Sequence, residues 1–182
     1  MATRYSRSSG GLDSFSILIL GETGRGKTRL TVKIANALAR ATGPGRVTVL
    51  DFAPDVMGVG KPMQGLHGWV KVLRPPRLHA PRLESRGDCG RAWMYARENA
   101  VETSRLLESY LEDPTPVLVV NDLSIHLHAG DPGLLEEAIQ ASIVFVGNSY
   151  WGEVLRDECG IWERERGLIA GIMDRVDLVW RL

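Results

Sequence analysis

Cysteine is scarce in this sequence, and the little that is present is poorly placed for binding a metal. The 182 residues include two cysteines, Cys89 and Cys159, which stand far apart and form no Cys-x-x-Cys pair. No histidine stands near either of them at the spacing of a zinc ligand. We therefore expect two buried or incidental thiols, and neither a zinc site nor a disulfide framework.

Long apolar runs are missing as well. No stretch approaches the roughly 20 apolar residues that a membrane-spanning helix needs. The N-terminal tail, residues 1–14, is polar and lacks the apolar core of a secretion signal. These absences predict a cytoplasmic protein with no membrane partner.

The chain also has no excess of charge of either sign. Its 22 Lys and Arg residues balance 22 Asp and Glu residues, so the formal net charge is zero. Charge alone therefore gives no reason to expect a nucleic acid partner. Apolar residues make up 44% and charged residues 24%, which is ordinary for a globular protein. The length suits a single domain over residues 15–182 after the polar tail.

What the sequence does contain is a regular alternation of short apolar runs with amphipathic stretches. The apolar runs predict strands over residues 16–20, 46–50, 69–73, 116–122, 142–147 and 176–182. Three-to-four spacing of apolar residues predicts helices over residues 27–41, 91–111, 131–141 and 161–173. Three prolines make residues 74–82 an extended connection. This alternation predicts an α/β fold, a three-layer sandwich with a mostly parallel central sheet.

A glycine-rich loop separates the first predicted strand from the first predicted helix. Its sequence, Gly21-Glu-Thr-Gly-Arg-Gly-Lys27-Thr28, fits the pattern G-x-x-x-x-G-K-[ST]. Glycines let successive backbone N–H groups turn toward phosphate oxygens, and the helix N-terminus adds partial positive charge. Lys27 is expected to reach the terminal phosphates, and the Thr28 hydroxyl suits Mg²⁺, which prefers oxygen ligands.

This loop resembles the Walker A motif of the P-loop NTPase superfamily, and the order of elements is similar over most of the chain. The resemblance implies a P-loop NTPase fold that binds ATP or GTP with Mg²⁺. It implies a catalytic role for Lys27 and a metal-binding role for Thr28. The phosphate-binding residues that it implies are Gly21, Glu22, Thr23, Gly24, Arg25, Gly26, Lys27, Thr28 and Arg29.

The strand at residues 117–122 resembles the Walker B strand of the same superfamily, which delivers a carboxylate to Mg²⁺. Asp122 is the residue at that position. Many of these ATPases carry a catalytic Glu directly after the Asp, whereas Leu123 follows here. We predict Asp51 as the catalytic base, with Asp55 as its competitor, because parallel strands bring their C-terminal ends to one edge of the sheet.

Several other polar residues are candidates for the same site. Asn148 ends the next strand and resembles the polar residue that senses the γ-phosphate, so we predict a catalytic role for it. His126 and His128 alternate along an expected extended segment and would point the same way, toward a substrate or metal, or simply pack. The remaining candidates are nucleophiles at His67 or His79, an arginine lid at Arg74, Arg77, Arg82 and Arg86, and arginine fingers at Arg156, Arg164, Arg166 or Arg175.

Three groups of P-loop proteins can be compared with this sequence. The run Val49–Asp55 is similar to the ParA and MinD group, but Glu22 stands where that group has a loop lysine. Small GTPases need an Asn-Lys-x-Asp motif, which this sequence lacks. The layout of residues 146–178 is similar to that of adenosylcobinamide kinases, which have a RecA-like topology.

These observations predict a RecA-like ATPase that couples hydrolysis to an unidentified partner. Two alternatives remain open at this point. One is a small-molecule kinase or nucleotidyltransferase of the adenosylcobinamide-kinase type, acting on an unidentified acceptor. The other is a nucleotide-binding module with negligible turnover. A homo-oligomer is compatible with each of them.

Overall fold

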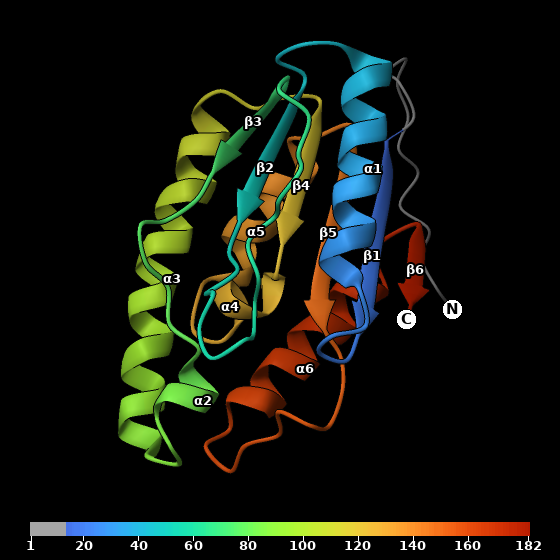
Figure 1. Cartoon of the computed structure of the whole chain (residues 1–182). Coiled ribbons are helices and arrows are strands. Elements are labelled where there is room, and N and C mark those ends of the chain that lie inside the picture. The colour runs from blue at the N-terminus through green and yellow to red at the C-terminus, as the bar shows by residue number, and fades with distance from the viewer. Residues whose placement is uncertain (1–13) are drawn as a thin grey trace, which may run out of the picture.

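The computed structural model describes residues 14–182, so the predicted N-terminal tail lies outside the described residues except for Ser14 (Figure 1). The strands are β1 Phe15–Gly21, β2 Val47–Asp51, β3 Val70–Leu73, β4 Val117–Asn121, β5 Val144–Tyr150 and β6 Leu178–Arg181. The helices are α1 Lys27–Thr42, α2 Pro81–Glu84, α3 Cys89–Glu112, α4 Leu123–Leu127, α5 Pro132–Gln140 and α6 Ile161–Met173. The six predicted strands and four predicted longer helices are therefore present.

All six strands form one parallel sheet, in the order β3-β2-β4-β5-β1-β6. Asp51 of β2 stands opposite Asn121 of β4, and Ile19 of β1 stands opposite Asn148 of β5. Because the strands are parallel, their C-terminal ends share one edge of the sheet. The glycine-rich loop follows β1 at that edge, so the polar strand ends and the loop lie close together.

Alternating side chains on the strands build two separate cores, one on each face of the sheet. Ile19, Val49 and Val119 pack against α1, together with Ala35 and Ala39 of that helix. The even-numbered neighbours on the same strands face the other way and pack against α3, α4, α5 and α6, as in the group Leu18, Leu50, Val120, Leu107, Leu135 and Ile169. Figure 1 shows α1 in front of the sheet and α4 and α5 behind it. The predicted three-layer α/β arrangement is consistent with this packing.

Two short helices replace segments that we expected to be extended. Residues 123–127 form α4 because Asp122 takes a left-handed conformation with φ 62°, which turns the chain directly after β4. His126 and His128 therefore do not point the same way. The second short helix is α2, which begins at Pro81, where the fixed φ of proline and its missing N–H suit the first turn of a helix.

The expectation of two unpaired thiols is wrong, because Cys89 and Cys159 form a disulfide bond with a Cα–Cα distance of 5.1 Å. The bond joins the first residue of α3 to the loop before α6. The same loop also accepts a hydrogen bond at the Cys159 carbonyl from the Trp93 indole, at 2.9 Å. The two cysteines are 70 residues apart, so their pairing depends on how the loop folds back onto α3.

This disulfide bears on the predicted localisation. Disulfide bonds persist mainly in oxidising compartments, so the bond and the expected cytoplasmic setting point in different directions, and the localisation stays a prediction. Among residues 14–182, no helix is both long and apolar enough to cross a membrane.

Replacing either cysteine with serine should lower the free energy of unfolding by about 2–4 kcal/mol, because the crosslink restricts the unfolded chain. Urea unfolding of wild type with and without reductant, beside Cys89→Ser and Cys159→Ser, measures the loss. Reductant should change the wild type and leave the variants unaffected. Alkylation of two cysteines in unfolded, unreduced wild-type protein would contradict the pairing.

Candidate phosphate-binding site

The loop between β1 and α1 has the backbone geometry that its glycines predict. Gly24 and Gly26 adopt left-handed conformations, with φ of 75° and 88°. Gly26 is the N-cap of α1, and neither a side-chain cap nor an acidic residue in the first turn satisfies the free N–H groups of this 16-residue helix. The helix therefore presents an electropositive, uncapped N-terminus, which favours an anion.

Lys27 stands at the first position of α1, and its side chain folds back over the loop. Its ammonium group donates hydrogen bonds to the carbonyl oxygens of Gly21, at 2.7 Å, and Glu22, at 2.6 Å. Burial lowers the pKa of Lys27, and the negative charges of Asp122, Glu22 and Glu165 oppose that effect. The positive charge and the uncapped helix end thus lie side by side.

A buried polar network lies next to this loop, on the face of the sheet that α1 covers. The Asn121 amide oxygen accepts hydrogen bonds from the Asn148 amide, at 2.8 Å, and from the Thr28 hydroxyl, at 3.3 Å. The Asn148 amide also donates to the Thr31 hydroxyl at 2.9 Å. Asp51 and Asn121 continue the odd-numbered positions of β2 and β4 that point toward α1, and Asn148 continues the even-numbered positions of β5 that do so. The three side chains therefore share this face.

Asp51 is fully engaged in hydrogen bonds within this network. One carboxylate oxygen accepts from the Asn121 amide at 2.6 Å and from the Ala53 N–H at 3.3 Å. The other accepts from the Met63 N–H and from the Arg74 guanidinium, each at 2.9 Å. Asp51 is 1% exposed and stands behind Asn121. These bonds favour a positioning role, and the catalytic role stays a prediction.

The side chain that contacts Thr28 belongs to Asn121, whereas the sequence pointed to Asp122. Sequence reasoning missed Asn121, although the alternation along residues 117–121 would have placed it on the α1 face. Asp122 is only partly exposed at the floor of the site, where burial raises the pKa of its carboxyl to about 7 against the opposing charge of Lys27. Its backbone N–H donates to the Asn148 side-chain oxygen at 3.0 Å. Amide and carboxylate thus occupy neighbouring positions.

A cavity of about 810 Å³ opens from the loop. Of the predicted phosphate-binding residues, it is lined by Thr23, Gly24, Gly26, Lys27, Thr28 and Arg29. Asn121, Asp122, Asn148 and the competitor Asp55 also line it. The Glu22 carboxylate turns elsewhere and accepts N–H bonds from Glu153, at 2.7 Å, and Val154, at 3.3 Å. That carboxylate therefore ties the loop to the segment after β5.

The other predicted arginines and histidines are mostly placed away from the cavity. Arg82 and His128 line it. Arg74 bonds to Asp51, and His79 stacks on Tyr95 with a ring-centroid distance of 4.2 Å. The predicted arginine fingers have other partners: Arg156 and Arg166 lie over tryptophan rings, Arg164 donates to the Gly130 carbonyl, and Arg175 pairs with Glu136.

No known protein-family model matches this chain, and no curated protein matches its sequence.

The oxygens at the floor of the site suit Mg²⁺ better than a transition metal. Residues 14–182 contain no group of three or more His, Cys, Asp or Glu side chains that could hold a metal ion. The Thr28 hydroxyl, the Asn121 amide oxygen and the Asp122 carboxylate are all oxygen donors beside the glycine-rich loop. Mg²⁺ is typically held by one or two such ligands together with water and substrate phosphates, so these residues fit the predicted ion.

Asp51→Asn should lower the free energy of unfolding by about 2–4 kcal/mol, because it sets two amides against each other and leaves Arg74 without its carboxylate. The rate at which each folded molecule cleaves the predicted nucleotide should stay within a few fold of wild type. Urea unfolding and single-turnover assays on the same sample measure both quantities. A loss of roughly 10²-fold in turnover with unchanged stability would instead make Asp51 the base.

The exchanged pair, Asp51→Asn with Asn121→Asp, is the control for this experiment. It restores one amide–carboxylate hydrogen bond. Its loss of unfolding free energy should therefore be smaller, by about 1 kcal/mol or more, than the sum of the losses in the two single variants. Strict additivity would show that the 2.6 Å contact contributes little.

Proposed function

We propose that this protein binds the Mg²⁺ complex of ATP, or of GTP, through residues 21–28 and transfers its γ-phosphoryl group to a small acceptor. The observation that carries the proposal is the uncapped N-terminus of α1 with Lys27 beside it, opening into one 810 Å³ cavity. An uncapped helix end next to a cation is a site for phosphate oxygens. On this proposal the chain has a P-loop NTPase fold of the RecA-like branch.

The proposed roles follow from what each group offers. The loop N–H groups and Lys27 would hold the phosphates and stabilise charge that develops on the transferred group. Thr28 and Asp122 would hold Mg²⁺, which neutralises phosphate charge when bound, with Asn121 beside Thr28. Asn148 would orient Asp122, since its side-chain oxygen accepts the Asp122 N–H at 3.0 Å.

The size and lining of the cavity favour transfer over hydrolysis coupled to a partner. Its volume is within the usual range of about 300–1,000 Å³ for small-molecule sites. Beyond the loop its walls are formed by residues 53–64, α2 and α4, including the apolar side chains of Pro54, Leu83 and Ile125. These walls leave room for an acceptor beside the phosphates. A partner-coupled ATPase remains a prediction from sequence.

The second candidate is a nucleotide-binding module with slow turnover. It is favoured by the amide of Asn121 beside Thr28, where a carboxylate would bind Mg²⁺ more strongly, and by the four hydrogen bonds on Asp51. Single-turnover measurement of γ-phosphate cleavage separates the two candidates.

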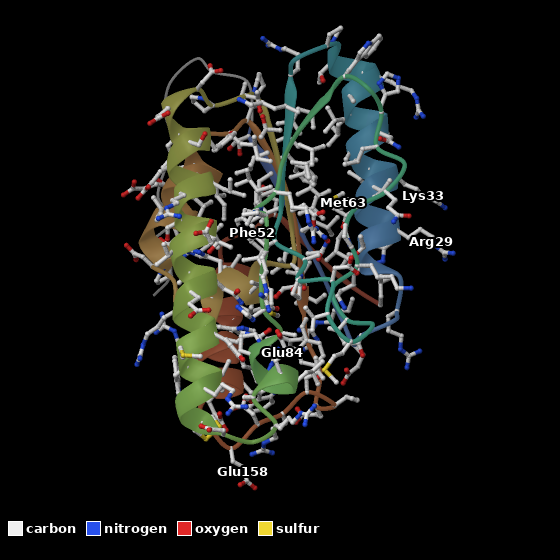
Figure 2. The ribbon with its side chains drawn as sticks, turned by 60° about the vertical axis from the view of Figure 1, so that its left-hand side comes forward. Arg29, Lys33, Phe52, Met63, Glu84 and Glu158 are labelled. Atoms are coloured by element: carbon white, nitrogen blue, oxygen red, sulfur yellow. A yellow bond between two sulfur atoms is a disulfide. The ribbon has the colours of Figure 1, made fainter. Side chains whose placement is uncertain are left out.

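Lys27→Ala should weaken Mg·ATP binding by at least about 10²-fold while the protein remains folded, because one charge-assisted contact to phosphate is lost. Calorimetric titration with Mg·ATP measures the affinity. Lys33→Ala is the matched control, since Lys33 is an exposed lysine that points outward from the same helix (Figure 2). Equal affinities for the two variants would rule out this site.

Mg·ATP binding should strengthen as pH rises toward 8, because Mg²⁺ needs the ionised carboxylate of Asp122, whose pKa is raised to about 7. Below that pKa the affinity should fall by about tenfold per pH unit from this group alone. Asp122→Asn should remove this contribution, whereas Asp113→Asn, an exposed control at the end of α3, should retain it. Calorimetry in buffers with different ionisation enthalpies measures the released proton.

The same group should affect stability in the opposite direction. Folded Asp122 keeps its proton between about pH 4 and 7, where an unfolded aspartate has lost it, so its contribution favours folding at low pH and declines as pH rises through that window. Urea unfolding of wild type and Asp122→Asn without ligand should therefore diverge between pH 5 and 7. Parallel stability curves would contradict the raised pKa.

A further inference from the structure

A second cluster of charged and polar side chains is buried in the cavity wall, on the sheet face opposite to α1. Arg82 of α2 and Glu165 of α6 form an ion pair at 2.8 Å, with their side chains 8% and 2% exposed. The His128 Nε2 atom, at the end of α4, is 3.5 Å from the same Glu165 oxygen. Arg82 also lies over the Tyr150 ring, 5.2 Å from its centroid. The phosphate loop uses none of these groups.

The two nitrogens of the His128 ring have different surroundings. Its side chain is 1% exposed and lines the cavity. Nε2 lies 3.5 Å from a Glu165 oxygen, whereas Nδ1 has no hydrogen-bond partner within residues 14–182. Buried polar atoms are nearly always hydrogen-bonded. A buried ring nitrogen without a partner therefore indicates that a bound molecule supplies one. The neighbouring His126 is equally buried but bonds to Thr103 at 2.8 Å and to the Asp131 carbonyl at 3.0 Å. The two histidines thus differ in their hydrogen bonding, although both are buried.

The cluster is within electrostatic reach of the phosphate site. Glu165 contributes to the pKa of both Lys27 and Asp122, and Arg82 contributes to that of Asp122. Lys27, Asp122 and His128 line the same cavity. A molecule that reaches His128 is therefore close to the transferred phosphoryl group if the nucleotide binds as proposed.

The wall around His128 selects the class of acceptor. The charges of Arg82 and Glu165 cancel within their ion pair, so this end of the cavity offers no free cation for an anionic acceptor. The neighbouring lining is largely apolar, with Ala80, Pro81, Leu83, Ile125 and Leu155. A compact, neutral molecule with a hydroxyl group matches such a surface, because a carboxylate or phosphate would be desolvated without a countercharge.

We propose that His128 and Glu165 form a general-base pair for a neutral hydroxyl acceptor that binds between α2 and α4, an inference that rests on the proposed phosphoryl transfer. His128 would be the catalytic residue, since it touches the acceptor, and Glu165 a positioning residue. Glu165 faces Nε2, which leaves Nδ1 for the acceptor proton. This is the division of labour found in histidine–carboxylate pairs of hydrolases.

The acceptor oxygen forms a bond to the γ-phosphorus while the bond from that phosphorus to the β–γ bridging oxygen breaks, and the electron pair leaves with the nucleoside diphosphate. The acceptor proton passes to His128, the resulting imidazolium is stabilised by Glu165, and the proton is later released to water. Burial and Arg82 lower the pKa of His128, whereas Glu165 and Asp157 raise it, with a net lowering that keeps the ring neutral.

The experiment uses water and glycerol as hydroxyl acceptors for γ-labelled Mg·ATP in single-turnover reactions. His128→Asn should slow cleavage by roughly 10²-fold or more and leave the Mg·ATP dissociation constant within a few fold. His126→Asn is the matched control, because this neighbouring buried histidine does not line the cavity. Its turnover per folded molecule should remain close to that of wild type.

The pH profile distinguishes a base from a structural residue. The wild-type rate should fall on the acid side as His128 is protonated, and Glu165→Gln should shift that limb to lower pH because it removes the charge that stabilises the imidazolium. At saturating Mg·ATP, where the effect of Asp122 on nucleotide binding is removed, His128→Asn should abolish the limb. The rates at each pH are expressed per folded molecule, so that a loss of stability in a variant is not mistaken for a change in the acid limb.

Each result decides the matter. Wild-type rates in His128→Asn, or an acid limb that survives in it, would overturn the proposal. A wild-type protein that binds Mg·ATP tightly but cleaves it with neither acceptor would refute the proposed phosphoryl transfer, and this inference with it. Failure of wild type to bind Mg·ATP better than Lys27→Ala would refute nucleotide binding at this site as well.

Discussion

The site depends on the hydrogen bonds of the Asp51 carboxylate. Its four donors come from strand β4, from the turn after β2, from the loop at Met63 and from Arg74. A buried carboxylate is costly unless its oxygens are satisfied, so these segments are held together at the edge of the sheet. Asn121 is thereby fixed, with its amide oxygen free to accept bonds from Thr28 and Asn148. Asp51 thus holds Asn121 in place at the floor of the candidate site.

The sheet divides the polar groups into two sets by the alternation of its strands. Positions that point toward α1 carry the network of Asn121 and Asn148. The other face carries a second set, in which the hydroxyls of Ser124 and Ser149 are 2.7 Å apart, near the His128 and Glu165 pair. The cavity reaches both sets, since α4 starts directly after the end of β4. One edge of the sheet thus brings polar groups from both of its faces to a single cavity.

The segment between β5 and α6 connects this edge to the disulfide bond. Its N–H groups donate to the Glu22 carboxylate of the glycine-rich loop, and the Leu155 N–H donates to the Tyr150 hydroxyl at 2.9 Å. At its other end, Asp157 caps α6 and Cys159 is bonded to Cys89. Short polar contacts hold one end of this segment and a covalent bond holds the other, so Leu155 is held in the cavity wall.

The sequence by itself determined the strands, the four longer helices and the glycine-rich loop, because apolar periodicity and glycine content are local properties. It also indicated the sheet edge where Asp51, Asp122 and Asn148 gather, since parallel strands end together. Tertiary structure alone decided the Cys89–Cys159 bond, the Asn121 contact with Thr28 and the pairing of His128 with Glu165. These contacts join residues that are 37 to 93 positions apart, and their partners depend on which side chains the packed layers bring face to face.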